Sequence, residues 1–517
     1  MDARKIKILW VDDEIEHLKA HLLYLVEKGF DVKTATNGQD ALEMIAVNIY
    51  DLVFLDENMP GISGLETLGR IKELKPELPV VMITKSEEED IMDEAIGRKI
   101  ADYLIKPVNP RQILSSIKKN LDKRRLISET TTSSYQSQFS QITLQINDSF
   151  SFEDWVDVYK KIVFWELELQ GSSGAMDEVL KMQKTEANHA FVKFIKDNYL
   201  DWLKGEAGPM LSHQLMKSRV LPLLEKGEKV FLVVIDNFRY DQWEIIKRDV
   251  TNDYIVDEEL LYSSILPTST QYARNALFSG LMPGQMREMF PEYWVGDDEE
   301  GSKNQFESEL IGTFFKRFRK DIKYGYAKIN DNESGRKMIE QLHDMLKNQF
   351  NAVVFNFVDM LSHARTEVKM IKELAANEAA YRSLTHSWFT HSTLKDLLVR
   401  LKEENIKVII TTDHGTIRVQ NPIKVLGDRN VNTNLRFKQG KNLAYKAKEV
   451  FEVKQPDLAF LPKYNVSTAY IFATHSDFFA YPNNYNYYAN YYRDTFQHGG
   501  ISMEEMIIPF SILSPKK

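Results

Sequence analysis

The sequence contains no cysteine among its 517 residues. This absence excludes disulfides and thiolate metal sites, so Asp, Glu and His remain as the available metal ligands. No uninterrupted apolar run approaches the ~18–20 residues of a membrane-spanning helix. The N-terminus, "MDARKIKILWVDDE", reaches carboxylates too early for a signal peptide. We therefore expect a cytoplasmic protein with no membrane span.

The sequence also lacks an excess of positive charge. Its net charge of −9 argues against broad electrostatic binding to duplex nucleic acid, although a small nucleotide held by metal ions stays possible. The middle of the chain has no clear basic recognition helix, which disfavours a DNA-binding transcription factor. With 43% hydrophobic and 27% charged residues, the chain can bury more than one core.

The first quarter of the chain alternates short apolar strands with amphipathic helices such as "QDALEMIAV" and "GLETLGRIKEL". The strands are rich in β-branched residues and continuous, as parallel strands buried on both faces should be. They read "IKILWV", "VKTAT", "DLVFLD", "PVVMIT" and "DYLIK". This pattern predicts a doubly wound, five-stranded α/β domain over residues 1–124.

Strand patterns are missing from the next segment. The stretch "SETTTSSYQSQFSQ" at 128–141 is rich in Ser, Thr and Gln without a clear period, and we interpret it as a linker. Apolar residues then recur at three- and four-residue spacing, with Ser151 and Asp154 as a capping pair. We predict a linker and helical module over 125–204. Strand–helix alternation returns at "KVFLVVIDNF" and predicts a larger α/β domain over 205–517.

Polar residues gather at the expected carboxyl ends of the first set of strands, the sheet edge where ligands bind in such folds. They are Asp12 and Asp13 after the first strand, Asp56 ending the third, Thr84 ending the fourth and Lys106 after the fifth. Such carboxylates suit a hard cation beside a nucleophilic carboxylate. The alternative is that they only cap helices and solvate strand ends.

This domain resembles the response-regulator receiver family over nearly its whole length. The resemblance implies that Asp56 accepts a phosphoryl group and that Asp12, Asp13 and Asp56 hold Mg²⁺. It further implies that Lys106 contacts the phosphoryl group, with Thr84 as the switch hydroxyl and Tyr103 as the rotating aromatic. Lys85 departs from the small residue usual in the family at its position.

The larger domain repeats the pattern of strands that end in metal-capable side chains. We expect three strands to end in such residues, namely in Asp236, in Asp359 with His363 four residues on, and in the pair Asp413 and His414, while His498 lies just before the last strand. Six such ligands suffice for two divalent ions, each with an open position for substrate. Taken singly, each is more often a turn residue, a cap or a surface histidine.

The segment "LPTSTQYARNALFSGLMPG" leads a hydroxyl-bearing loop into an amphipathic helix. A hydroxyl at a helix N-terminus lies where the dipole and free N–H groups favour an anion. A metal-activated threonine there could attack phosphorus. Thr268, Ser269 and Thr270 are all candidates.

These motifs together resemble the alkaline phosphatase superfamily in its PglZ branch, over about 205–517. In the nucleotide pyrophosphatase relatives the nucleophilic Thr lies ten residues before a Gly and thirteen before a Pro, which here selects Thr270. The resemblance implies zinc, with two ions held as follows: Asp236, Thr270, Asp413 and His414 around one, and Asp359, His363 and His498 around the other. Manganese or iron would suit similar ligands. The family's Asn three residues past the nucleophile is Ala273 here, and either Arg274 or Asn275 could contact phosphate instead.

The order of domains resembles the response regulators of the Bacteroidetes type IX secretion system. That resemblance implies a sensor histidine kinase, a secretion-machinery component and an extracytoplasmic-function sigma factor as partners. It also implies an oligonucleotide or cyclic-nucleotide substrate and a phosphorylation-dependent homodimer, with the receiver's helices near 87–99 and 110–122 as its usual face.

Two functions remain open from the sequence. One is a phosphorylation-controlled, two-metal phosphodiesterase with Thr270 as nucleophile, and the other is a signalling scaffold that keeps the phosphatase fold and its metals without catalysis. The Tyr/Asn-rich segment 481–492 is either a packed surface segment or a stacking surface for a base.

Overall fold

The computed structural model describes residues 6–75, 78–84, 100–170, 175–296, 299, 301–367, 375, 377–427, 432 and 434–516. Lys85 and the expected helix near 87–99 lie outside these residues. The chain divides into two compact units, Met1–Ser134 and Tyr135–Lys517, and each is described by itself. Within the described ranges no helix is long and apolar enough to cross a membrane.

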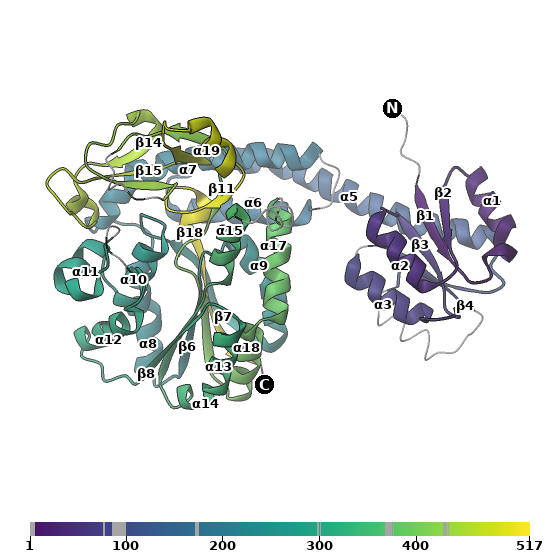
Figure 1. The fold of residues 1–517 in the computed structure, drawn as a ribbon, viewed down its shortest axis with the longest axis horizontal. Coiled ribbons are helices and arrows are strands. Elements are labelled where there is room, and N and C mark those ends of the chain that lie inside the picture. The colour runs from purple at the N-terminus through teal and green to yellow at the C-terminus, as the bar shows by residue number, and fades with distance from the viewer. Residues whose placement is uncertain are drawn as a thin grey trace. The chain divides into compact units, whose positions relative to one another are not determined.

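The N-terminal unit is the predicted five-stranded parallel sheet, in the order β2-β1-β3-β4-β5 (Figure 1). Its strands are β1 (Lys7–Val11), β2 (Asp31–Ala35), β3 (Leu52–Asp56), β4 (Val80–Thr84) and β5 (Asp102–Ile105). Its described helices include α1 (Lys19–Glu27), α2 (Gly38–Val47) and α3 (Gly64–Leu74). Strands β1, β3 and β4 are buried almost throughout, with a separate apolar cluster on each face of the sheet. The strand order reverses beside β1, so the carboxyl ends of β1, β3 and β5 open on one crevice.

The predicted linker at 128–141 is wrong, because these residues belong to one long helix, α5 (Pro110–Asn147). Neither Gly nor Pro interrupts the chain between 111 and 147, so nothing in the backbone ends the helix. Tyr135, Phe139, Ile142 and Ile146 also recur at helical spacing and pack in the core of the second unit. Ser and Thr lower helix propensity, but this apolar stripe outweighs them.

Two further helices, α6 (Phe152–Glu168) and α7 (Ala175–Leu203), complete the predicted helical module. Helix α6 begins with the expected capping box, in which the side chains of Ser151 and Asp154 each accept a backbone N–H. Trp155 of α6 packs against Phe191 and Phe194 of α7. The aromatic residues of this module are continuous with the core of the large α/β domain, which makes the module part of the second unit.

The large α/β domain is built on a six-stranded sheet in the order β7-β18-β10-β6-β9-β8. Its strands are β6 (Val230–Ile235), β7 (Tyr254–Ser263), β8 (Tyr324–Ile329), β9 (Phe350–Phe355), β10 (Lys407–Thr411) and β18 (Ile507–Pro515). Strands β10, β6, β9 and β8 are parallel, and β18 runs antiparallel to both of its neighbours. The carboxyl ends of the four parallel strands therefore meet at one edge, where a site can form.

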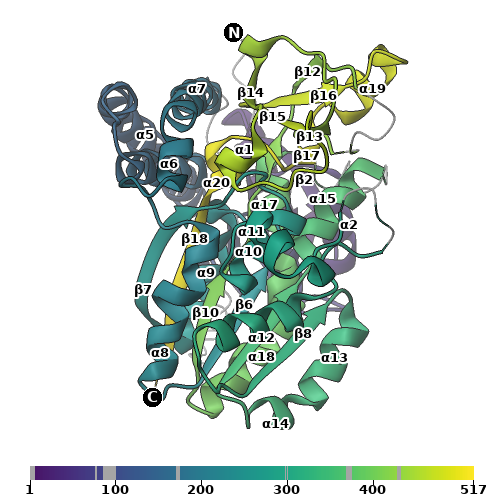
Figure 2. The same ribbon diagram turned by 90° about the vertical axis from the view of Figure 1, so that its left-hand side faces the viewer.

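Helices cover both faces of this sheet (Figures 1 and 2). One face is covered by α8 (Leu221–Glu225), α10 (Thr270–Ser279), α11 (Pro283–Met289) and α12 (Glu307–Arg317). The others are α9 (Tyr240–Asp253), α13 (Asn332–Glu340), α14 (Leu342–Met345), α15 (Phe357–Glu367), α17 (Glu378–His391) and α18 (Thr393–Glu403). Short single turns lie at Ile15–Leu18, Ser212–Gln214, Met216–Val220, Pro291–Tyr293, Ala447–Glu449 and Pro456–Ala459.

Between β10 and β18 the chain forms a small mixed cap at the carboxyl edge of the sheet, coloured yellow-green in Figure 1. It contains β11 (Ile417–Arg418), β12 (Asn421–Lys424), β13 (Phe437–Gly440), β14 (Val450–Val453), β15 (Ala469–Ala473), β16 (Asp477–Ala480), α19 (Tyr485–Tyr492) and β17 (Phe496–Gln497). A single turn, α20 (Met503–Met506), returns the chain to the central sheet.

Candidate active site

The receiver crevice brings together the residues that the sequence placed there. Lys106 Nζ lies 2.7 Å from Asp56 Oδ1 and 2.9 Å from Asp12 Oδ2, and the carboxylates of Asp12, Asp13 and Asp56 lie close enough to share one cation. Burial raises the pKa of Asp56, and Lys106 works against that rise. The arrangement offers a carboxylate oxygen beside a cation site and a fixed ammonium.

The two remaining receiver residues lie on neighbouring strands. Thr84 ends β4 and is fully buried, and Tyr103 on β5 packs partly buried against the apolar cluster of one sheet face. Thr84 therefore lies at the end of the fourth strand, as the sequence predicted.

In the large α/β domain, the predicted ligands other than His498 come after the carboxyl ends of β6, β9 and β10, and His498 directly follows β17. Asp236 follows β6 directly, and Asp413 comes two residues after the end of β10. The prediction that Asp359 ends a strand is wrong. Strand β9 stops at Phe355, and Asp359 lies in the first turn of α15. Because residues four apart share one face of a helix, this position aligns Asp359 with His363.

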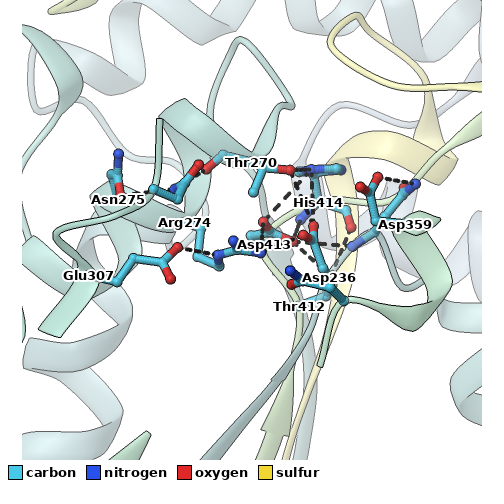
Figure 3. Close-up of polar contacts among 12 residues, drawn as sticks. Asp236, Thr270, Arg274, Asn275, Glu307, Asp359, Thr412, Asp413 and His414 are labelled. Carbon is cyan, nitrogen blue, oxygen red and sulfur yellow. Dashed lines mark hydrogen bonds and ion pairs between the residues drawn. The ribbon is translucent and has the colours of Figure 1, made fainter. Parts of the chain in front are cut away.

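Thr270 is the first residue of α10, and its hydroxyl faces the ends of β6 and β10 (Figure 3). Its Oγ1 lies 3.3 Å from Asp236 Oδ1 and 3.1 Å from His414 Nε2. The hydroxyl of Thr268 is engaged elsewhere, donating to Gly500 O and accepting from Gly499 N–H. Of these two threonines, Thr270 is therefore the one whose hydroxyl faces the predicted ligands.

Two groups of ligand atoms result, and each is compact enough to hold one ion. Asp236, Asp413 and His414 form the first group, which is completely buried. Within it, His414 Nε2 lies 3.7 Å from Asp236 Oδ1 and 3.8 Å from Asp413 Oδ2. The second group contains Asp359 with one histidine on each side, His363 and His498.

In this second group, Asp359 Oδ2 lies 3.5 Å from His363 Nε2, and Oδ1 lies 3.6 Å from His498 Nε2. The side chain of His363 is 59% exposed, which marks the open side of the group. The rings of His414 and His498 stack with centroids 4.3 Å apart, so the two groups are adjacent.

Backbone carbonyls fix which nitrogen of each buried histidine is free. His414 Nδ1 lies 3.0 Å from Gly415 O, and His498 Nδ1 lies 3.2 Å from Thr268 O. A carbonyl can only accept, so each Nδ1 carries the proton and each Nε2 keeps its lone pair toward the carboxylates. Hydrogen bonds of this kind orient histidines that ligate metals.

Asn237 holds two of the carboxylates and Thr412 holds the turns that carry the ligands, and the sequence reasoning missed both. Asn237, at φ 61°, donates its N–H to Asp413 Oδ1 (3.3 Å) and its Nδ2–H to Asp359 Oδ1 (3.2 Å). Thr412 donates to His414 O and receives the N–H of Phe238. Asn tolerates the left-handed conformation, and an Asn directly after a strand-ending Asp was the available signal.

Arg274, buried on α10, is the positive charge of the site. Its Nη1 lies 2.5 Å from Asp236 Oδ2 and 3.6 Å from Asp413 Oδ2, and its Nε donates to Glu307 Oε1. Asn275 instead donates to Lys303 O and accepts from Asn304. Of the two residues left open by the sequence, Arg274 faces the ligands. Glu307, 33 residues further on, had no signal in the sequence.

The carboxylates differ sharply in their electrostatic surroundings. Burial and the negative charge of Asp236 raise the pKa of Asp359 and of Asp413 to about 6 each. Burial also works against the charge of Asp236, but Arg274 and His414 outweigh it and lower its pKa. Burial and the neighbouring histidines lower the pKa of His498 well below its ordinary value, so its ring is neutral at pH 7.

The donor set fits zinc. Asp413 Oδ2 is buried without a hydrogen bond, with Arg274 Nη1 no nearer than 3.6 Å, while its Oδ1 accepts the N–H groups of Asn237 and His414. Buried unpaired carboxylate oxygens are costly unless a cation completes them. Carboxylate oxygens and neutral imidazoles, without sulfur, are ligands of catalytic zinc sites.

The Tyr/Asn-rich segment forms α19 at the surface of the cap. Tyr487 stacks on Tyr491 and Tyr488 stacks on Tyr492, with interplanar angles of 14°. Tyr485 is anchored through its hydroxyl to Pro422 O. Tyr487 is 63% exposed, so part of the segment packs on the cap and part faces solvent.

Comparison with family models divides the chain into three parts. A BREX system PglZ alkaline phosphatase-like domain matches residues 215–512, a PorX response regulator linker domain matches 125–203, and a response regulator receiver domain matches 8–118. The three matches together reproduce the PorX architecture.

Similar curated proteins match through the receiver alone. The transcriptional regulatory protein ZraR of Klebsiella oxytoca is 33% identical over 142 residues, which are 28% of this chain and 32% of that protein. A CpxR homolog of Haemophilus influenzae is 36% identical over 27% of this chain and 61% of its own length. The chain thus spans about a third to three fifths of these relatives.

Among solved structures, a CheY-like receiver from Methanospirillum hungatei is 28% identical, with a TM-score of 0.23. The match covers 23% of this chain and 97% of that one. DrrB of Thermotoga maritima, an OmpR/PhoB homolog, is 31% identical with a TM-score of 0.22, covering 23% of this chain and 54% of its own.

Proposed function

The chain belongs to the PglZ alkaline phosphatase-like family, and from this premise we propose that it is a response regulator whose phosphorylated receiver controls a two-zinc phosphodiesterase. The observation that carries the proposal is the position of Thr270 Oγ1, 3.3 Å from Asp236 and 3.1 Å from His414, beside a second group of three ligands. A hydroxyl in that position lies between a carboxylate and a histidine that could share a metal ion with it.

The residues divide between the two ions as the ligand groups do. Asp236, Asp413 and His414, together with the Thr270 hydroxyl, would hold one zinc, and Asp359, His363 and His498 would hold the other. When bound, zinc supplies Lewis acidity that lowers the pKa of a ligated hydroxyl and offsets charge on the phosphoryl oxygens.

The chain's own groups support a double displacement at phosphorus. Thr270 loses its hydroxyl proton to solvent and Oγ1 forms a bond to phosphorus, while the bond to the leaving oxygen breaks and that oxygen takes up a proton from solvent to depart as an alcohol. Water then attacks phosphorus, and its attack breaks the bond to Thr270 and restores the hydroxyl. The N-terminus of α10, where Thr270 stands, favours the negative charge of the phosphoryl group.

The substrate we infer is a nucleotide-type phosphodiester, such as an oligonucleotide or a cyclic nucleotide. Arg274 supports this, because its guanidinium lies beside Asp236 and Asp413, where it would be near a phosphate bound to zinc on these carboxylates. Once zinc shares the charge of these two carboxylates, the guanidinium is available to a phosphate oxygen.

For the receiver, we propose that Asp56 accepts a phosphoryl group from a sensor histidine kinase of the PorY type, with Mg²⁺ on Asp12, Asp13 and Asp56. Lys106 then contacts the phosphoryl group, and Thr84 and Tyr103 respond to it. The PorX architecture supports a cytoplasmic role in type IX secretion, with a secretion-machinery component and an extracytoplasmic-function sigma factor as partners. Phosphorylation would promote a homodimer.

The test compares hydrolysis of a cyclic dinucleotide by the zinc-loaded wild type and by Thr270→Val. Ser269→Ala is the matched control, because this neighbouring hydroxyl makes no capping hydrogen bond to α10. We expect turnover to collapse in Thr270→Val and to persist in Ser269→Ala, with zinc retained in both.

Equal turnover in the wild type and Thr270→Val would exclude Thr270 as the nucleophile. If zinc binds but neither the wild type nor the variants hydrolyse the substrate, the chain is instead a phosphorylation-switched scaffold with a metal-bound, non-catalytic phosphatase fold.

A further inference from the structure

Helix α7, in the segment matched by the linker-domain model, reaches the catalytic domain through two polar side chains. Lys184 Nζ lies 2.9 Å from Glu166 Oε1 of α6 and 2.9 Å from Glu504 Oε1 of α20. One turn further along α7, Asn188 donates to Glu504 Oε2 (3.0 Å) and accepts the N–H of Met503 (2.8 Å). Both carboxylate oxygens of Glu504 are therefore held from α7.

These contacts are buried, so they can fix the position of α7 against the domain. Asn188 and Glu504 are each less than 5% exposed, and the side chain of Lys184 is 14% exposed. Burial alone would lower the pKa of Lys184, but Glu166 and Glu504 outweigh it, so the ammonium stays charged. An apolar contact would tolerate sliding of α7 along the domain, whereas a buried charge with a hydrogen-bonded amide fixes one register.

Helix α20, which α7 contacts, packs against the turns that carry His414 and His498. Gly415 donates its N–H to Glu505 O (3.1 Å), and a Cβ on Gly415 would lie 2.0 Å from Glu504 O. The turn after His414 thus lies flat against α20. Gly500, two residues after His498, donates its N–H to Glu505 Oε1 (2.9 Å).

The chain just before α20 also meets the loop before Thr270. Thr268 Oγ1 donates to Gly500 O and accepts the N–H of Gly499. Residues 498–505 therefore contact the turn that carries His414, the loop that leads to Thr270, and helix α7.

We infer that Lys184 and Asn188 are positioning residues for the metal site: they hold α20, and α20 sets the places of His414 and His498. The linker domain is thereby a structural part of the catalytic site rather than a tether between domains. This inference deepens the proposed function and rests on it only where turnover is measured.

The experiment uses the full chain with Lys184→Met, which removes the ammonium and keeps most of the side-chain volume. Lys181→Met is the matched control, because Lys181 lies one turn earlier on α7 in an exposed pair with Glu178. Lys184→Arg keeps the charge. Asn188→Leu removes the amide contacts and leaves the Lys184–Glu504 pair in place, so it carries the test if Lys184→Met does not fold.

The first measurement is amide hydrogen exchange on the metal-free protein. We expect residues 413–416 and 498–506 to exchange faster in Lys184→Met and Asn188→Leu, and to be unchanged in Lys181→Met. Zinc affinity and kcat should each fall about 10–100-fold, the range for residues that support metal ligands, with KM nearly constant. Lys184→Arg should recover most of the loss.

Unchanged exchange and unchanged zinc affinity in a folded Lys184→Met or Asn188→Leu protein would overturn the inference. Failure of the proposed function looks different, because the wild type would then bind zinc without turnover. The exchange and affinity measurements would still decide the role of α7.

Discussion

Replacing Asp413 by Asn should stabilise the metal-free protein, although it removes a metal ligand. In the folded chain, burial and Asp236 raise the pKa of Asp413 from 3.8 to about 6. A shift of about 2 units corresponds to about 3 kcal/mol of penalty for holding the carboxylate charged in the folded state at pH 7. Asn keeps the shape and can still accept, at Oδ1, the N–H groups of Asn237 and His414.

The sign of the pH dependence follows from these pKa values. The folded pKa lies above the unfolded one, so the unfolded chain binds fewer protons between pH about 4 and about 6. The contribution of Asp413 to wild-type stability therefore falls as pH rises through that window, and its full penalty applies above it. Below about pH 4 the carboxyl is neutral in both states, and Asp413→Asn should match the wild type.

The assay is chemical denaturation of zinc-stripped wild type and Asp413→Asn. Unfolding of the second unit, Tyr135–Lys517, is monitored by tryptophan fluorescence. Asp457→Asn, at an exposed carboxylate paired with Lys463, is the control. We expect Asp413→Asn to gain up to about 3 kcal/mol at neutral pH and nothing at acid pH. Zinc should reverse the order, because it stabilises the folded wild type through an intact ligand set. A metal-free Asp413→Asn protein less stable than the wild type at neutral pH would refute the reasoning.

Two more predictions concern the turn at Gly415 and the receiver. Gly415→Ala places a Cβ 2.0 Å from Glu504 O, so the turn must move; zinc affinity measured by titration should drop at least about 10-fold, and wild-type affinity would contradict this. Asp56→Ala removes the phosphoacceptor, so light scattering with a phosphoryl donor should detect no induced association. Dimerisation of the mutant like that of the wild type would exclude Asp56 as the switch.

The fold class was predictable because strand and helix periods dominate the sequence. The continuous apolar strands at 7–11 and 230–235 can only be buried on both faces, and their order along the chain indicates a wound sheet. The segment 128–141 was harder, because its composition suggests a linker and the helix is indicated only by Tyr135 and Phe139 within it and by Ile142 and Ile146 just after it, at helical spacing. Composition was the weaker signal there.

The candidate metal ligands were predictable because they stand in recognisable sequence motifs, but the residues that support them were not. The sequence placed Asp359 at a strand end, but a strand that stops at Phe355 lets a helix bring Asp359 and His363 to the same face. Glu307 has no local signal, since the partners that make its burial possible, Arg274, Tyr326 and Lys328, are brought to it only by folding. Contacts of this kind depend on tertiary structure, and spacing in the sequence does not encode them.

The most direct test of the central claim, a threonine nucleophile in a two-zinc site, is the stereochemistry of hydrolysis at phosphorus. A phosphorothioate diester of known configuration is cleaved by the zinc-loaded protein in ¹⁸O-labelled water, and the configuration of the product is determined. Two successive in-line displacements, first by Thr270 and then by water, predict net retention. Net inversion would mean that water attacks directly, and it would contradict the account.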